Sequence, residues 1–292
     1  MKRLRQAILE TVAYADIFDF PLTQAEIWRF LIGCTPKLAV FHQALVGLIQ
    51  THDLDAQGKY HILPRRRKII SARCQNEKTF PQKMRRARQA AKILSWIPSV
   101  WGVGISGALA MHNAPAVDDI DFLVITAPGT LWFTRGWSAL ILDTLGWRRR
   151  PGTKNCQDQI CLNMFMDASN LRIAKKEQDL YSAHEVVQLI PLVNKHQIYT
   201  QFLWANRWAR KWLPQAVVWP KRTRKNWSQV YRKWSWLEQI ARKTQLWYMA
   251  KRRTQEAISA KVLRFHPVDA RTWVLANYQN RLQGLDKTHV SP

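Results

Sequence analysis

Three apolar runs of strand length follow one another between residues 100 and 166, and polar or helical stretches separate them. Residues 100–105 and 159–166 are each predicted to form a strand, and Phe122-Leu-Val-Ile125 continues a third strand without interruption. Residues 130–147 are predicted to form a helix that ends at Gly146. Strands that alternate with helices in this way predict an α+β fold, with a small sheet domain over residues 76–178.

The first 75 residues have a different pattern, in which helices come before short strands. Residues 2–16 are predicted to be helical, and Thr23-Gln-Ala-Glu26 has the spacing of a capping box at the start of a second helix. A third helix is expected to open at Thr35-Pro36 and to run to about residue 50. A turn and a short strand are expected over residues 55–63, so this part is predicted to be a winged-helix-like domain over residues 1–75. Its third helix has no arginine, which leaves both DNA reading and protein contact open.

The remaining part, residues 179–292, is predicted to be a basic, Trp-rich helical region. A basic helix is also expected earlier, over residues 79–97. Trp204, Trp208 and Trp212 recur every four residues, which is the spacing of one helical face, and we interpret them as core. Residues 221–266 contain no glycine or proline. A single helix of that length would span about 69 Å at roughly 1.5 Å per residue, so a bend or a pair of helices is expected.

Composition changes the picture through charge. The 292 residues carry 45 Lys or Arg against 20 Asp or Glu, for a net charge of +25, while 47% of the residues are hydrophobic. A globular chain with so strong a positive field favours polyanions such as nucleoside triphosphates or nucleic acid. Adaptation of the surface to solubility is the other explanation, and a membrane surface is a less favoured partner. The four cysteines lack zinc-like spacing, and a reducing cytoplasm is the expected location.

The candidate chemistry lies at the start of the middle strand, in Asp119-Ile-Asp121. Side chains two residues apart on a strand point to the same face and lie roughly 6–7 Å apart along it. Two carboxylates in that relation can hold one metal ion or bracket two. Gly107 precedes them, and a glycine lets the backbone approach a phosphate closely.

This pattern resembles the motif of the polymerase beta-type nucleotidyltransferase superfamily, in which Gly-Ser or Gly-Gly precedes an Asp-hydrophobic-Asp strand. Gly107-Ala108 takes the place of Gly-Ser, with Ser106 as a substitute for the missing hydroxyl, and Asp119 and Asp121 take the place of the catalytic carboxylates. The resemblance covers roughly residues 92–167 and implies a small mixed sheet. It also implies transfer of a nucleoside monophosphate from a triphosphate to an acceptor, with Mg²⁺ or Mn²⁺ held by Asp119 and Asp121 and the phosphates by residues 106–108. The acceptor is not implied.

Members of this superfamily usually carry a third carboxylate on the next strand, and here the polar residue inside that strand is Asn163. An amide oxygen is a weaker ligand than a carboxylate for a hard cation. Asp158 and Asp167 flank the strand, but aspartate is common in turns, and we interpret both as turn residues. The alternative function is therefore a catalytically degenerate protein of the same fold that serves as a basic nucleic-acid-binding module.

Overall fold

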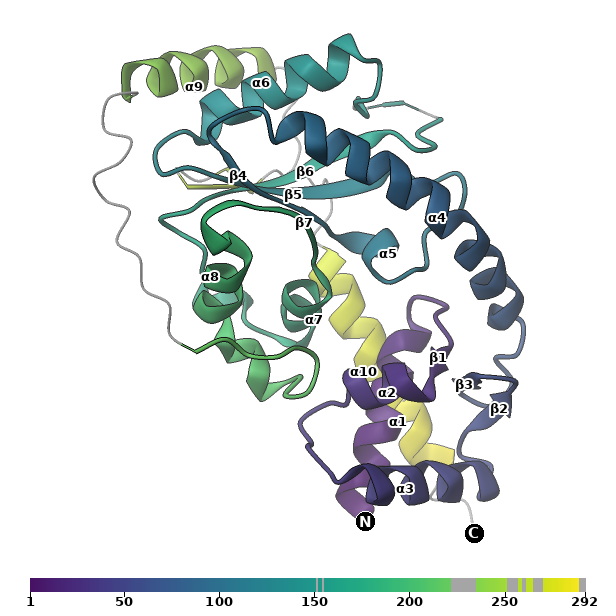
Figure 1. Ribbon diagram of the computed structural model, residues 1–292. Helices are drawn as coiled ribbons and strands as arrows, with labels where there is room; N and C mark the ends of the chain where they lie inside the picture. Colours follow the sequence, from purple (N-terminus) through teal and green to yellow (C-terminus); the bar gives the residue numbers. More distant parts are fainter. Residues whose placement is uncertain are drawn as a thin grey trace.

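A mixed sheet of six strands, in the order β7-β4-β5-β6-β9-β8, forms the centre of the molecule (Figure 1). The computed structural model describes residues 1–150, 152–153, 155–221, 235–250, 257–258, 261–264 and 270–288. The strands are β4 (Val100–Ile105), β5 (Ile120–Thr126), β6 (Ile160–Asp167), β7 (Ile190–Asn194), β8 (Ala257–Ile258) and β9 (Val262–Arg264). Strands β4 and β5 are antiparallel, whereas β5 and β6 are parallel, and this combination of helices and a mixed sheet confirms the α+β class.

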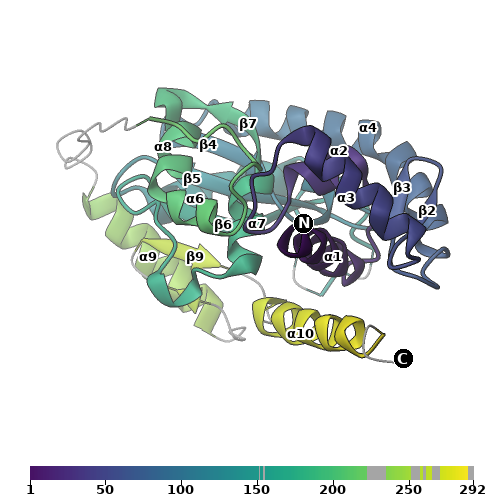
Figure 2. The same ribbon diagram turned by 90° about the horizontal axis from the view of Figure 1, so that it is seen from below.

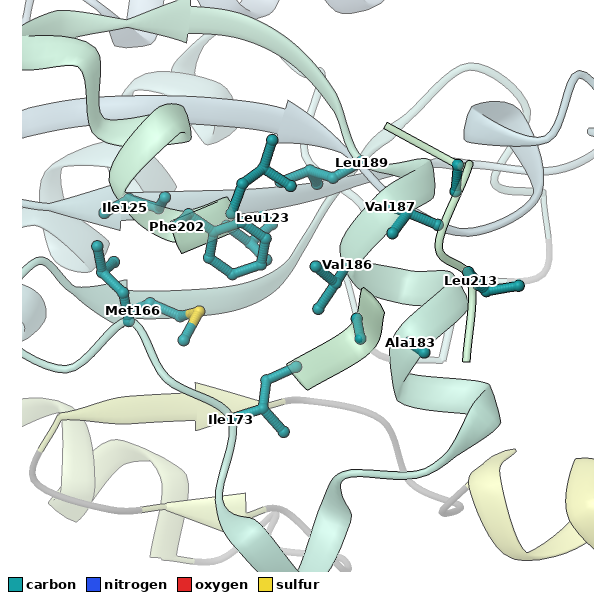
Figure 3. Close-up of a cluster of buried hydrophobic side chains, with 14 of the residues drawn as sticks. Leu123, Ile125, Met166, Ile173, Ala183, Val186, Val187, Leu189, Phe202 and Leu213 are labelled. Carbon is teal, nitrogen blue, oxygen red and sulfur yellow. The ribbon is translucent and has the colours of Figure 1, made fainter. Parts of the chain in front are cut away.

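Helices cover both faces of this sheet. On one face, Phe122 and Val124 of β5 pack with α4 and α6, and on the other face Leu123 and Ile125 pack with α7 and α8. The second of these clusters is drawn in Figure 3, where Phe202 of α8 and Val186 of α7 meet the sheet residues. The helices of the two layers are α4 (Ile69–Leu94), α6 (Leu131–Thr144), α7 (Leu180–Gln188) and α8 (Ile198–Ala205). Alternation along β5 thus fixes which side of the sheet each of its residues faces.

The N-terminal part forms the expected helices and short strands. Its elements are α1 (Lys2–Asp16), β1 (Leu22–Thr23), α2 (Gln24–Arg29), α3 (Leu38–Gln50), β2 (Asp55–Gln57) and β3 (Tyr60–Ile62). The capping box is confirmed, because the Thr23 hydroxyl accepts from the Glu26 amide at 3.2 Å and Glu26 accepts from the Thr23 amide at 2.8 Å. Helix α3 begins at Leu38, slightly later than the Thr35-Pro36 signal predicts. The three strands pair in the order β1-β3-β2.

The basic helix expected over residues 79–97 is longer than predicted. Helix α4 begins at Ile69 and contains Pro81, so it also crosses the domain boundary that the sequence places after residue 75. Polar residues dominate its first half and hide the helical period there. That half is held to the N-terminal part by the pair of Arg73 with Glu26 at 2.9 Å, and within the helix Arg73 also pairs with Glu77 at 3.0 Å.

The C-terminal region contains strands as well as helices, which corrects the prediction of a helical region. Strand β7 pairs with β4, and β9 pairs with β6, so this region extends the sheet at both edges. These strands are short, and their pairing with β4 and β6 spans long sequence distances, so a local pattern does not reveal them. Helix α8 ends at Ala205, and Trp208 and Trp212 pack against the core from beyond it. The predicted continuous helical face of tryptophans is therefore wrong, although these two tryptophans are core-packed.

The last helices return to earlier parts of the chain. Helix α9 (Ser235–Ala250) lies along α6, and α10 (Ala270–Thr288) lies along α1 and α7 (Figures 1 and 2). Between residues 221 and 266 the structure describes one helix, α9, and the strands β8 and β9. The rest of the stretch for which a bend or helix pair is expected, residues 222–234, 251–256, 259–260 and 265–266, lies outside the described residues. No helix in the described part of the chain is both long and apolar enough to cross a membrane.

Candidate functional site

The two carboxylates of Asp119-Ile-Asp121 lie together, as their spacing predicts. Asp119 immediately precedes β5, and Asp121 is the second residue of that strand. Asp121 lies on the face of the sheet that Leu123 and Ile125 share, toward α7 and α8. Ligand atoms of Asp119, Asp121 and Cys161 all lie within 4.8 Å of one another. The two strands thus bring three potential metal-ligating side chains to one point.

Gly107 stands directly against Asp121 and begins the four-residue helix α5 (Gly107–Ala110). Its φ angle is +65°, in the left-handed region that glycine tolerates best, and a Cβ added to it would lie 2.7 Å from Oδ2 of Asp121. The neighbouring Ser106 amide donates to the backbone oxygen of Asp121 at 3.0 Å. The expected partnership of the glycine turn with the carboxylate strand is therefore present, and it depends on the absence of a side chain at residue 107.

The carboxyl group of Asp121 is buried at an electrostatic cost. Burial, and then the nearby charge of Asp119, raise the pKa of Asp121 to about 7. Among the described residues, no group forms a hydrogen bond with Asp121 Oδ1 or with the buried Ser106 hydroxyl. An unpartnered buried carboxylate oxygen next to a second carboxylate is an arrangement that a bound cation would stabilise.

Arg149 already supplies one positive charge at this point. Its Nη1 donates to Asp119 Oδ2 at 2.7 Å, and its side chain is 42% exposed. The sequence contains the basic run 148–150 here but does not indicate which arginine faces the carboxylates. A guanidinium in this position can contact the carboxylate and an incoming phosphate group in turn.

The third position of the site is occupied by Cys161 and not by Asn163. The parallel register pairs Asp121 with Cys161, and an irregularity in β6 then pairs Leu123 with Met164. Asn163 falls within this irregularity and is buried, so it does not occupy the register position opposite Asp121. Simple alternation along the strand misses such a shift, because an added residue displaces every later side chain. Burial raises the pKa of the Cys161 thiol, and the two carboxylates add to this effect.

The two aspartates that flank β6 have structural contacts, which agrees with the turn interpretation. Asp158 pairs with the buried ammonium group of Lys83 at 3.1 Å. Asp167 accepts from the amides of Gly129 at 2.6 Å and Ser169 at 2.7 Å. Both are therefore engaged away from Asp119 and Asp121.

The donor set fits a divalent cation held by the two carboxylates. Oxygen ligands suit Mg²⁺ and Mn²⁺, and the unpartnered Oδ1 of Asp121 gives such a cation a ligand atom without breaking a hydrogen bond. A protonated thiol is a poor ligand for Mg²⁺, so Cys161 completes the wall of the site better than its coordination shell.

A cavity of about 550 Å³ adjoins the glycine turn. Gly107, Ala108 and Asp118 line it on the side of the sheet, and Glu185 and Gln188 of α7 line it on another side. Glu185 is also one of the charges that raise the pKa of Asp121, so it lies near the carboxylate pair. Sequence reasoning missed Glu185, because α7 carries no motif and reaches the site only through the tertiary fold.

Comparison with known proteins found no matching family model, no matching curated protein and no matching solved structure.

Proposed function

We propose that this chain is a metal-dependent nucleotidyltransferase that moves a nucleoside monophosphate from a nucleoside triphosphate to an acceptor. The observation that carries the proposal is the contact between the left-handed Gly107 and the buried carboxyl group of Asp121, with Asp119 beside it. This chemistry needs a backbone turn that a phosphate group can approach and a pair of metal-ligating carboxylates, and here the glycine turn lies directly against Asp121.

In the proposed reaction, an acceptor oxygen attacks the α-phosphorus of the triphosphate. The new oxygen–phosphorus bond forms as the bond from the α-phosphorus to the α–β bridging oxygen breaks, and its electron pair leaves with pyrophosphate. The acceptor proton passes to a carboxylate of the site or to water. A bound Mg²⁺ or Mn²⁺ would supply charge neutralisation and orientation of the phosphates.

The chain's own residues have separate roles in this proposal. Asp119 and Asp121 hold the cation, while Ser106, Gly107 and Ala108 form the turn that receives the phosphates. Arg149, which contacts Asp119, neutralises phosphate charge. Because Ala108 has no hydroxyl, the buried Ser106 hydroxyl is the one that can donate within this turn.

The finer architecture is part of the same proposal. We assign residues 76–178 as a nucleotidyltransferase-type domain, which the antiparallel β4–β5 and parallel β5–β6 pairs support. We assign residues 1–75 as winged-helix-like, which the element order and the β1-β3-β2 sheet support. The exposed residues of α3 include Leu38, Val40 and Val46, which favours protein contact over DNA reading.

Calorimetric titration of ATP, GTP, CTP and UTP in Mg²⁺ tests the site without knowledge of the acceptor. We expect metal-dependent binding to the wild type and its loss in Asp119→Asn/Asp121→Asn. Asp53→Asn/Asp55→Asn is the matched control, since it has the same spacing and charge change in the N-terminal part and should bind as the wild type does. Equal binding by all three proteins, or binding by none, would contradict the proposal. The nucleic-acid-binding alternative predicts salt-sensitive binding of nucleic acid that does not depend on Asp119 and Asp121.

A further inference from the structure

The described residues that line the cavity beside Gly107 carry charge of the opposite sign to the whole chain. The chain carries a net charge of +25, yet no lysine or arginine is found among the described residues that line this cavity. Its charged lining residues are the acids Asp19, Asp118 and Glu185. A cavity whose described lining has carboxylates but no lysine or arginine would attract a positively charged ligand.

Most of the rest of the cavity wall is apolar or aromatic. Tyr14, Phe18 and Phe20 line it from the N-terminal part, and Trp273 lines it from α10. The ring of His184 also lines it, stacked on Tyr14 with ring centroids 4.1 Å apart. Aromatic faces attract organic cations through their negative charge density and also bury apolar groups. At about 550 Å³, the cavity has the size of a site for a small molecule.

The acids do not all have the same surroundings. Asp19 is largely exposed and pairs with Arg66, so it belongs to the rim. Asp118 is half-buried and precedes Asp119, and Glu185 lies near Asp121. The acidic wall of the cavity therefore continues into the proposed reaction site, and a ligand in the cavity would lie next to the bound phosphates.

We propose that this cavity binds the acceptor substrate, and that this acceptor is a small organic cation with an apolar body and a reactive hydroxyl group. The role of this ligand as acceptor rests on the proposed nucleotidyl transfer, whereas the preference of the cavity for a cation follows from its lining residues. The ammonium group is held by Glu185 and Asp118 and the aromatic wall, while the hydroxyl group reaches the carboxylate pair. An anionic polymer does not fit this wall.

Three dansyl probes with one fluorophore test the charge preference. Dansylcadaverine carries an ammonium group, dansyl-6-aminohexanoate carries a carboxylate and N-butyl dansylamide is neutral. We expect the cation to bind the wild type at least tenfold more tightly than the anion, although the net charge of the protein favours the anion. Tighter binding of the anion would overturn the proposal.

Substitutions in the cavity wall test whether the cationic probe binds in the cavity. Ala72 lines the cavity from an exposed position on α4, and the adjacent exposed Ser71 does not line it. Ala72→Trp should weaken binding of the cation at least tenfold, whereas Ser71→Trp should leave it within twofold. Glu185→Gln should weaken binding of the cation about fivefold and leave the neutral probe unchanged. Equal affinity of wild type and Ala72→Trp would overturn the assignment.

Titration of Mg²⁺-ATP into the protein saturated with dansylcadaverine separates the acceptor from the nucleotide. We expect ATP to bind without displacing the probe. Displacement in a competitive manner would show that the cavity receives the nucleoside, and this would overturn the acceptor assignment. If ATP does not bind with or without the probe, the proposed nucleotidyl transfer fails, while the cation preference of the cavity is still decided by the probe series.

Discussion

At the scale of single residues, the candidate site depends on the lack of a Cβ atom at Gly107. The Asp121 carboxyl group fills the space that a side chain at residue 107 would need, so the glycine and the carboxylate each fix the position of the other. A buried carboxylate with a pKa near 7 costs the fold stability at neutral pH, because the unfolded chain releases this proton more readily. A buried carboxylate at such a cost is more typical of functional sites than of stable cores.

Gly107→Ala tests this contact against the cost of backbone strain alone. The variant should lose about 2–4 kcal/mol of unfolding free energy, because alanine is strained at positive φ and its Cβ displaces Asp121. Gly58→Ala is the control, since Gly58 has φ +59° with no atom within 4 Å of an added Cβ, and it should lose about 1 kcal/mol. Urea unfolding measures both losses, and equal losses would show that the Asp121 contact carries no energy.

His184 makes stability depend on pH in a predictable direction. Burial lowers the pKa of His184 to about 3, so the folded protein keeps this ring neutral while the unfolded chain protonates it near pH 6.5. The contribution of His184 to the unfolding free energy is therefore complete above pH 6.5 and is lost as the pH falls toward 3, by about 2 kcal/mol at pH 5. Protonation of Asp121 acts in the opposite direction over the same range and equally in every variant, so the comparison with His184→Phe isolates the histidine. Between pH 7.5 and pH 5, urea unfolding should show a stability change about 2 kcal/mol less favourable in the wild type and in His42→Phe, a change at an exposed histidine, than in His184→Phe. A pH dependence of His184→Phe equal to that of the wild type would contradict the prediction.

At the scale of elements, the start of α6 is capped by a side chain from another helix. Glu238 of α9 accepts from the backbone amides of Trp132 at 2.8 Å and Phe133 at 2.9 Å. Gln245, two turns later on α9, donates to the Trp132 carbonyl at 2.7 Å. The amides of a first helical turn have no partner within their own helix, so α9 completes α6.

Glu238→Ala should therefore loosen α9 and destabilise the protein by about 1–2 kcal/mol, since two charge-assisted hydrogen bonds to a helix start are lost. Gln239→Ala changes the adjacent exposed position and should have no such effect. Amide hydrogen exchange of α6 and α9 reports the change directly. No acceleration of exchange in α6 or α9, or the same acceleration in both variants, would count against the capping role.

Some elements of this fold are determined by residues that are close together in the sequence, and others are not. The capping box at Thr23, strand β5 and the turn at Gly107 were predictable, because each depends on residues within a few positions of one another. Strands β7 and β9 were not, because they are short strands that join the sheet by pairing with the distant strands β4 and β6. Cys161 was missed for a related reason, since an irregularity in β6 changes the register that simple alternation assumes. Glu185 reaches the site only because α7 packs against the sheet.

At the scale of the whole molecule, the two ends of the chain close the cavity together. Helix α1 lines one side, and α10 lines another and packs on α1 through Tyr278 and Leu282. Asp16 at the end of α1 is 2% exposed and forms ion pairs with Arg66 at 2.7 Å and with Arg281 of α10 at 2.8 Å. One buried carboxylate thus joins the N-terminal part, the following loop and the C-terminal helix.

Arg281→Ala should release α10 from this junction without unfolding the sheet. The exposure of Arg281 limits the loss of global stability to about 1 kcal/mol, because water screens the pair and Arg66 still neutralises Asp16. Gln283→Ala, at an exposed position on the same helix, is the control. Hydrogen exchange of residues 270–288 should accelerate in Arg281→Ala alone, while strands β4, β5 and β6 keep their protection. Acceleration throughout the sheet would mean that α10 is part of one cooperative unit with the core, and that the cavity opens only when the whole protein unfolds.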